Sequence, residues 1–329
     1  MAAAAARGAS LSTFLEESTV KEKTAVKYRK ELSAFTKNCT VPLKIDPAID
    51  AELVSYMQEL YEEGHQPSRG ECLLAGVLFL WPAFGKLGTR TLPRAWKALR
   101  GWRRRCPARS RCPHSLPIWA GIAVQLWREG LYGFAFYLMM MVATYTRPSE
   151  LLSVQRRDLQ KPLENVSLHW QLLLFPEERP ERSKVYAAND SIELQAEWAP
   201  WLPAVASALA KGGQKERIFP FSYGEFCLAF RKAVESLQLP TMVPYQARHS
   251  GPSIDAARNL RDRASIKARG RWTADKSVLR YEQRARLVAS FNKLPHSLQD
   301  YLKECERKLP DLFLGKLLVS ALPSPPTRD

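Results

Sequence analysis

The apolar residues of this 329-residue chain recur at helical spacing over most of its length, and they change to strand-like spacing in one stretch after Asp158. That stretch predicts three short antiparallel strands, at Val166–Phe175, Lys184–Ala187 and Ser191–Leu194. From Gly251 onward the pattern is helical again. The sequence therefore predicts a mainly helical fold that contains one small antiparallel β-sheet.

A first helical domain is expected over residues 18–105, after a disordered tail at 1–17. Hydrophobic positions, Pro93 in a first helical turn and Gly64 at a helix end indicate four helices. The expected spans are Ser18–Asn38, Asp50–Gly64, Gly70–Trp81 and Pro93–Arg105.

A second, larger domain is expected over residues 115–314, between a basic linker at 106–114 and a disordered, proline-rich tail at 315–329. The segment near Leu131–Tyr145 is apolar on nearly every side, which predicts a buried helix. Thr146 is the expected cap of the next helix, because Pro148 then lies in the first turn. Further helices are expected at Ser115–Glu129, Leu194–Lys211 and Tyr223–Leu239.

The charge balance favours a polyanionic partner. Lys and Arg number 49 against 33 Asp and Glu, which gives a formal net charge of +16. Six arginines lie between residues 100 and 111, near the expected domain boundary. Such a run is either a solvated linker or a surface that contacts phosphates. The candidate phosphate contacts are Arg103, Arg104, Arg105, Arg109 and Arg111.

Membrane insertion and metal binding are not expected. The most apolar stretch, Leu131–Thr144, is too short to span a bilayer, and the N-terminus lacks the apolar centre of a secretory signal. Cys106, Cys112 and His114 lie close together but do not have a standard zinc spacing, which favours free thiols. We therefore expect a soluble intracellular protein, nuclear in a eukaryote, without a metal or cofactor.

Charged and aromatic residues in the second domain follow a fixed order. Arg147 and Glu150 begin a helix, Lys184 begins a predicted strand, and Pro244–Gly251 has the sequence PYQARHSG. Trp272 follows Arg248 by 24 residues (272 − 248), and Tyr281 follows Trp272 by nine (281 − 272).

This order resembles the tyrosine recombinases of the phage-integrase type, over about residues 115–294. That family has an arginine with an acidic residue three positions later, a lysine in a β-hairpin, and a His-x-x-Arg-His box. Gly-His or Gly-Trp follows, and the nucleophilic tyrosine comes nine residues after it. This chain departs at Tyr245, which stands where the family usually has the first histidine, while His249 matches the second.

The resemblance implies a role for each matched residue. Tyr281 would attack a DNA phosphate, and the guanidiniums of Arg147 and Arg248 would stabilise the charge that develops on the phosphoryl oxygens. Lys184 would protonate the departing 5′ oxygen. The supporting roles would fall to Glu150, which orients Arg147, and to Trp272, which packs beneath the site and offers its indole N–H.

The position of Tyr245 leaves three readings open. A hydrogen-bonding phenol supports the reaction, His249 replaces the missing imidazole, or the enzyme is slow or inactive.

The function implied is that of a site-specific recombinase or integrase, from a mobile element, that cleaves and rejoins double-stranded DNA through a 3′-phosphotyrosyl bond. The two domains would clamp the duplex, and four copies would assemble on paired sites. The segment Leu298–Leu314 would then dock on a neighbouring protomer or pack on its own domain. The alternatives are a DNA-binding relic without chemistry and a type IB topoisomerase.

Overall fold

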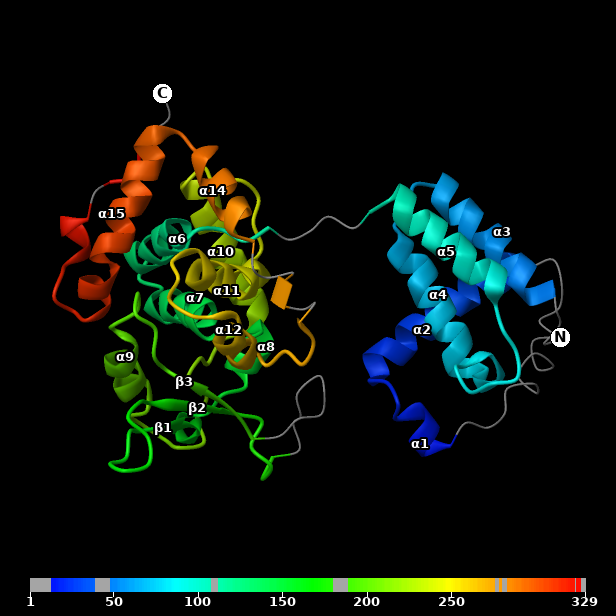
Figure 1. Cartoon of the computed structure of the whole chain (residues 1–329), viewed down its shortest axis with the longest axis horizontal. Coiled ribbons are helices and arrows are strands. Elements are labelled where there is room, and N and C mark those ends of the chain that lie inside the picture. The colour runs from blue at the N-terminus through cyan, green and yellow to red at the C-terminus, as the bar shows by residue number, and fades with distance from the viewer. Residues whose placement is uncertain are drawn as a thin grey trace. The chain divides into compact units, whose positions relative to one another are not determined.

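The chain divides into two compact units, Met1–Ser110 and Arg111–Asp329 (Figure 1). The computed structural model describes residues 13–38, 48–107, 112–179, 189–275, 278–279, 283–322 and 324–326. The division falls within the segment 106–114 that the sequence suggests as a linker.

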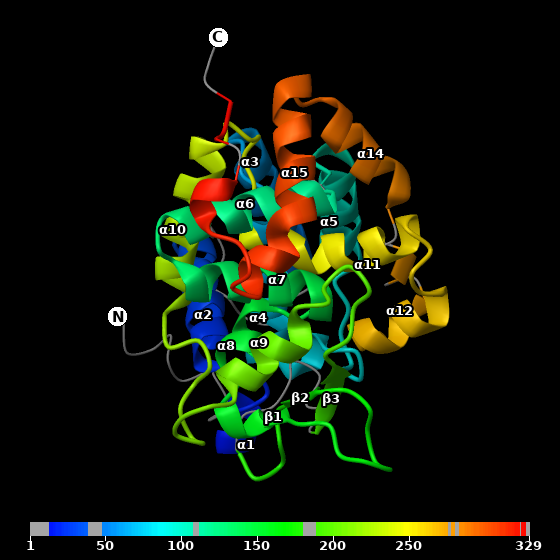
Figure 2. The ribbon, with the colours of Figure 1, turned by 90° about the vertical axis from the view of Figure 1, so that its left-hand side faces the viewer.

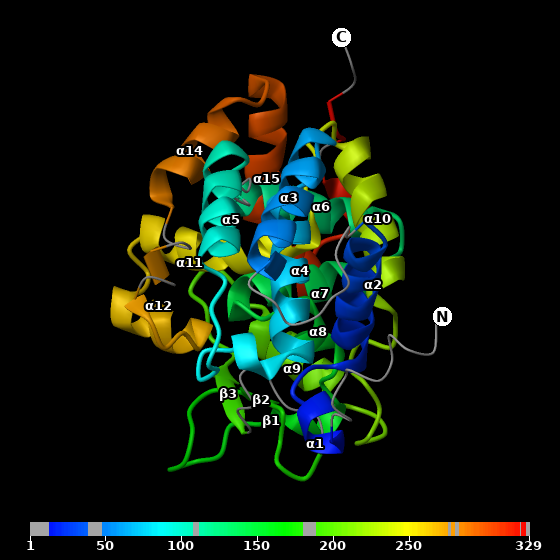
Figure 3. The ribbon, with the colours of Figure 1, turned by 90° about the vertical axis from the view of Figure 1, so that its right-hand side faces the viewer.

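The first unit consists of helices in its described part (Figure 3). Its core is formed by apolar residues from α2, α3, α4 and α5, among them Leu32, Leu53, Leu73 and Leu99. Gly70 lets two helices approach closely, because a Cβ there would lie 2.9 Å from the Trp102 ring. The helices are α1 (Phe14–Glu17), α2 (Glu22–Asn38), α3 (Ala48–Glu62), α4 (Pro67–Leu80) and α5 (Pro93–Arg105), with a 3₁₀ turn at Pro82–Phe84.

The start of the first unit differs from the prediction. Phe14–Glu17 form a short helix inside the stretch expected to be a disordered tail. Thr13 caps this helix by accepting a hydrogen bond from the Glu16 N–H, and Ser18 ends it. The long helix therefore begins at Glu22 and not at Ser18.

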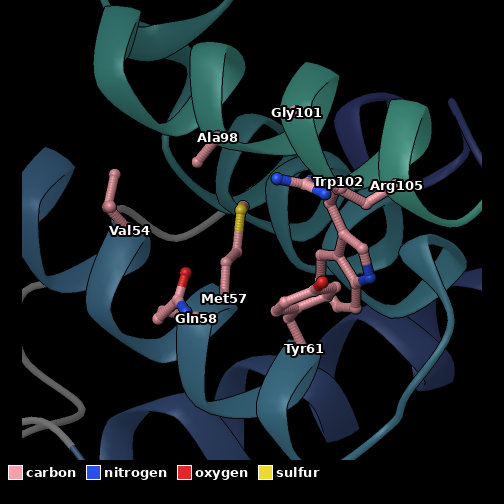
Figure 4. A pocket seen from close by; sticks show the side chains of 8 residues that line it. All are labelled: Val54, Met57, Gln58, Tyr61, Ala98, Gly101, Trp102 and Arg105. Atoms are coloured by element: carbon pink, nitrogen blue, oxygen red, sulfur yellow. The ribbon is translucent and has the colours of Figure 1, made fainter.

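An open hollow of about 470 Å³ lies between α3 and α5 (Figure 4). Met57 and the rings of Tyr61 and Trp102 form part of its wall, and the two rings meet edge to face with centroids 6.4 Å apart. Arg105 lines it as well, and Arg103, Arg104 and Arg105 are all exposed on α5.

The second unit is built around two buried helices, α6 and α7 (Figure 2). Every residue from Tyr137 to Tyr145 is buried, so the prediction of a buried helix is confirmed for all but its first turn, where Tyr132 is exposed. Helices α15 and α10 pack on α6, while α11 packs on α7. The helices are α6 (Leu116–Arg128), α7 (Tyr132–Thr144), α8 (Pro148–Leu152), α9 (Leu202–Leu209), α10 (Tyr223–Ser236), α11 (Ala247–Ala257), α12 (Arg263–Gly270), α14 (Arg284–Asn292) and α15 (His296–Phe313).

A three-stranded antiparallel sheet in the order β1-β2-β3 completes the second unit. In its register Leu172 of β2 lies opposite Leu159 on one side and Ile192 on the other, and all three are buried. The alternate residues of β2 thus face the helices. The strands are β1 (Leu159–Gln160), β2 (Gln171–Leu174) and β3 (Asp190–Glu193).

The predicted strand boundaries need correction although the class of sheet is right. The strand expected from Val166 begins only at Gln171. Asn165 lies in the left-handed region with φ 62°, and Leu163 and Ser167 close a tight turn around it. The outer strand at Leu159–Gln160 was not predicted. The expected strand at 184–187 lies outside the described residues.

Two C-terminal segments clarify the limits of the second unit. Helix α15 packs on α6 of its own unit, with Leu302 and Leu309 buried, so the intramolecular alternative for this segment describes the chain. The expected tail is ordered further than predicted: Val319–Ala321 form a 3₁₀ turn, and Leu322 is buried in the same core.

Within the described part, no helix has both the length and the apolar character needed to cross a membrane.

Helix α9 begins at Leu202, after the buried Trp201, and ends at Leu209. It is therefore shorter at both ends than the expected helix Leu194–Lys211.

Candidate active site

Arg147 and Glu150 are brought together by the turn between α7 and α8. Tyr145 ends α7 in the left-handed conformation with φ 55°, and the chain then turns into α8. Arg147, not Thr146, occupies the N-cap position. The Arg147 N–H donates to Glu150 Oε2 at 2.8 Å, and the Arg147 guanidinium donates to Glu150 Oε1. Thr146 is instead buried against the hydroxyl of Thr144.

Arg248 lies in the first turn of α11 and is only 2% exposed. Its guanidinium donates to the carbonyl oxygen of Tyr145 and, at 3.2 Å, to that of Gly270. Its Nη1 is also 3.8 Å from Glu150 Oε2. Gly251 lets α11 lie close to α7, because a Cβ there would be 2.1 Å from a backbone oxygen of α7 and 2.5 Å from the Tyr145 ring.

Trp272 covers one side of this arginine. Its ring is nearly parallel to that of Tyr145, with centroids 6.4 Å apart and an interplanar angle of 13°. The Cζ atom of Arg248 is 5.5 Å from the Trp272 ring centroid. A side chain at Gly270 would come within 2.2 Å of the indole, so glycine is required where α12 ends. The indole therefore fixes Arg248 by contact and by cation–π attraction.

A third arginine, Arg271, completes the cluster and was not singled out from the sequence. Its Nη2 donates to Glu150 Oε2 at 2.6 Å, and its Nη1 is 3.9 Å from Asp190 Oδ2. The available signal was a departure from the motif, since this chain has an arginine between Gly270 and Trp272.

The electrostatics of the cluster follow from one buried carboxylate among three guanidiniums. Burial disfavours ionised Glu150, but Arg271, the Arg147 N–H and Arg248 outweigh it and hold the pKa of Glu150 below its ordinary value. Burial also opposes the charge on Arg147, yet Glu150 and then Tyr245 raise the pKa of Arg147. Burial lowers the pKa of Arg248, against the attraction of Glu150. Three positive charges against one negative charge make the cluster suited to an anion.

Tyr245 lies beside the arginines, in a 3₁₀ turn at Pro244–Gln246 just before α11. After Glu150, its phenol contributes to raising the pKa of Arg147, so it lies next to that guanidinium. The His249 ring is 5.6 Å from the Tyr245 ring at an interplanar angle of 60°. The residue in place of the expected histidine therefore directs a phenol at the cluster.

The turn that carries Tyr245 is anchored to the start of the second unit. Gln246 Oε1 accepts from the Val243 N–H at 2.7 Å, which fixes the orientation of the amide. Gln246 Nε2 then donates to the Cys112 carbonyl at 2.9 Å and to His114 Nε2 at 3.0 Å. His114 is thus occupied by a structural contact.

Comparison with solved structures identifies the fold. A lambda integrase dimer bound to a COC′ core site matches at a TM-score of 0.59 and 13% identity, covering 81% of this chain and 73% of that one. The Tn1549 transposon integrase in complex with transposon right end DNA matches at 0.58 and 13%, covering 82% and 93%. The XerH site-specific recombinase in a post-cleavage complex with palindromic difH matches at 0.54 and 13%, covering 83% and 80%.

The chain has the tyrosine recombinase fold. No protein-family model matches the sequence, and no curated protein matches it.

Within this tyrosine recombinase fold, the structure brings together Arg147, Tyr245, Arg248 and Trp272, with Glu150 at their centre and His249 beside Tyr245. Lys184 and Tyr281 lie outside the described residues. Arg109 and Arg111 lie outside them as well, whereas Arg103, Arg104 and Arg105 are exposed at the end of α5 in the first unit.

No group of three or more metal-ligating side chains is placed to hold an ion among the residues that the structure describes. Cys106 and Cys112 form no disulfide bond within the described residues.

Proposed function

We propose that this chain is a DNA strand transferase, a recombinase or integrase that cleaves and rejoins double-stranded DNA through a 3′-phosphotyrosyl bond at Tyr281. The observation that carries the proposal is the cluster of Arg147 and Arg248 around Glu150, with Trp272 packed against Arg248, in a tyrosine recombinase fold. Tyr281 follows Trp272 by nine residues (281 − 272).

The proposed reaction exchanges one phosphate ester bond for another. The Tyr281 oxygen bonds to phosphorus and loses its proton, while the bond from phosphorus to the 5′ oxygen breaks. Lys184 gives that oxygen a proton. Arg147 and Arg248 hold the non-bridging oxygens, where negative charge increases in the transition state. A 5′-hydroxyl of another strand then attacks the phosphotyrosine, so the reaction needs no ATP.

Double-stranded DNA is the proposed partner because the charge and the fold agree on it. The formal net charge is +16, and the lambda, Tn1549 and XerH structures are complexes with DNA. Both units would contribute to binding, the first through Arg103, Arg104 and Arg105 on α5. Assembly of four copies on paired sites is part of the same proposal.

Tyr245 favours a second candidate, a DNA-binding relic in which chemistry is lost. The phenol stands at the motif position of a histidine, and an imidazole can exchange a proton near neutral pH. Against the relic, the phenol helps to raise the pKa of Arg147, after Glu150, so the position still belongs to the cluster. A type IB topoisomerase would share the covalent step but would not join two sites.

Covalent trapping on DNA tests the proposal. Purified protein is mixed with a pool of nicked duplexes of varied sequence and denatured in SDS, and adducts are resolved by electrophoresis. We expect an adduct with the wild type and none with Tyr281→Phe, which removes only the nucleophilic oxygen. An adduct that persists in Tyr281→Phe would contradict the assignment of the nucleophile.

Two further outcomes separate the alternatives. Relaxation of supercoiled plasmid without joining of two sites would favour a topoisomerase. Salt-sensitive DNA binding without any adduct would favour the relic.

A further inference from the structure

Arg271 adopts a backbone conformation that its side chain does not favour. It ends α12 with φ 55° and ψ 44°, in the left-handed region where glycine is the usual residue. Gly270, its neighbour, is not among the residues with positive φ, so the strain falls on the arginine. Strained backbone near a functional cluster is maintained when the surrounding contacts require it.

The contacts of Arg271 explain why this arginine is held there. Its side chain is 13% exposed, and its Nη2 is 2.6 Å from an oxygen of Glu150, whose side chain is 3% exposed. Asp190 lies farther away, at 3.9 Å from Nη1. The buried Nε and Nη1 of Arg271 have no hydrogen-bond acceptor among the described residues. Glu150 is therefore its main partner.

Charge decides what this pairing does for the cluster. Glu150 is shared by Arg147, Arg248 and Arg271, so three positive charges face one negative charge. Without Arg271, the same carboxylate would be neutralised by Arg147 and Arg248 alone. Arg147, whose guanidinium already donates to Glu150, would then supply more of this neutralisation, and less net positive charge would face a phosphate.

We propose that Arg271 is a further positioning residue, a third guanidinium that occupies Glu150 and so leaves donors of Arg147 and Arg248 to bind the scissile phosphate. This inference rests on the proposed strand-transfer function and names the charge arrangement that the function uses. Arg271 acts through Glu150, so its effect depends on whether that carboxylate is charged.

The first test removes the side chain and relieves the backbone in one substitution. Arg271→Gly fits a φ of 55° without strain, so a turn residue without a role would tolerate it. We expect Arg271→Gly to form the covalent adduct about 10²-fold more slowly than the wild type on a nicked duplex. Gln238→Gly is the matched control, since Gln238 has φ 52° and is exposed after α10. It should cleave at the wild-type rate.

A second substitution tests the dependence on Glu150. In Arg271→Gly combined with Glu150→Gln, the carboxylate that competes for Arg147 and Arg248 is neutral. We expect the double variant to cleave no more slowly than Arg271→Gly alone. Losses that multiply, or wild-type cleavage by Arg271→Gly, would overturn the proposal. If Arg271→Gly does not fold, Arg271→Gln replaces it in both comparisons.

Binding of inorganic phosphate keeps the inference separate from the proposed function. At constant ionic strength, phosphate should raise the melting temperature of the wild type more than that of Arg271→Gly. A wild type that forms no adduct but shows this difference would contradict strand transfer and support the role of Arg271. Equal phosphate shifts in the two proteins would contradict that role, whatever the adduct assay shows.

Discussion

Tyr245 is the residue on which the chemistry of the site depends most. Its phenol lies beside Arg147, in a cluster that is otherwise cationic apart from Glu150. Tyrosine phenols ordinarily keep their proton at neutral pH, so the group is suited to donate a hydrogen bond to a phosphoryl oxygen. A histidine at the same position would add proton exchange near pH 6.5.

We therefore expect Tyr245→Phe to slow adduct formation by about 10²-fold, because it removes the donor and keeps the ring. Tyr245→His should match or exceed the wild-type rate and should depend on pH near 6.5. Single-turnover cleavage at pH 5.5 to 8.5 measures both effects. A complete loss of cleavage in Tyr245→His would show that the phenol has a role an imidazole cannot fill.

The sequence predicted the charged residues of the site better than it predicted the residues that hold them in place. Four residues could be recognised because their types and their order along the chain resemble the tyrosine recombinase motif: Arg147, Glu150, Arg248 and Trp272. The signal for Arg271 was weaker, an arginine between Gly270 and Trp272, because its importance depends on a left-handed backbone and on a carboxylate 121 residues away. Such a contact exists only in the folded chain.

At the scale of elements, α11 carries Arg248. The hydrogen bonds of Gln246, just before α11, set the position of this helix. His114 Nε2 must accept the hydrogen bond from Gln246 Nε2, because the Gln246 Oε1 is already used by the Val243 N–H. The backbone N–H of His114 donates to Ser250 Oγ at 2.8 Å, so the segment just before α6 is attached to α11 directly. Protonation of the imidazole would place two donors against each other.

This anchor predicts a loss of stability in mild acid. Burial lowers the pKa of His114 from 6.5 to about 4, so the folded chain keeps the ring neutral where the unfolded chain binds a proton. The free energy of unfolding should therefore fall as pH drops from about 6.5 toward 4, by on the order of 3 kcal/mol in all. Urea unfolding at pH 7, 6 and 5 measures this.

His114→Gln should flatten the pH dependence, because a glutamine oxygen accepts the same hydrogen bond without titrating. His296→Gln is the control, since His296 is exposed at the start of α15. Equal pH slopes in the wild type and His114→Gln would contradict the explanation.

Element boundaries were predictable where a residue enforces them. Pro93 begins α5, and the helix spans Pro93–Arg105 as expected. The strands were less predictable, because a strand depends on partners distant in sequence. Leu159–Gln160 became a strand through its pairing with β2, whereas the apolar Val166 and Leu168 are 76% and 86% exposed near a tight turn.

At the scale of the whole molecule, the two units differ in how much their sequences reveal about function. The second unit contains the motif residues, and its fold follows from them by resemblance. The four helices expected in the first unit fit many small helical domains, so its role must be argued from charge. Helix α5 buries Leu99 and Trp102 and leaves Arg103, Arg104 and Arg105 exposed. A helix with one face in a core and arginines on the other is suited to contact phosphates.

If α5 binds the DNA backbone, replacing its arginines should change how binding depends on salt. We expect the triple variant Arg103→Gln, Arg104→Gln, Arg105→Gln to bind duplex DNA more weakly at every sequence. Each lost phosphate contact should reduce the slope of log K against log salt by about 0.9, because fewer counterions are released on binding. The control variant removes the same number of charges from exposed positions in and after α15, at Lys303, Arg307 and Lys316. A slope that changes equally in both variants would mean that α5 acts only through the net charge of the molecule, whereas a change confined to the α5 variant locates a phosphate contact on the first unit.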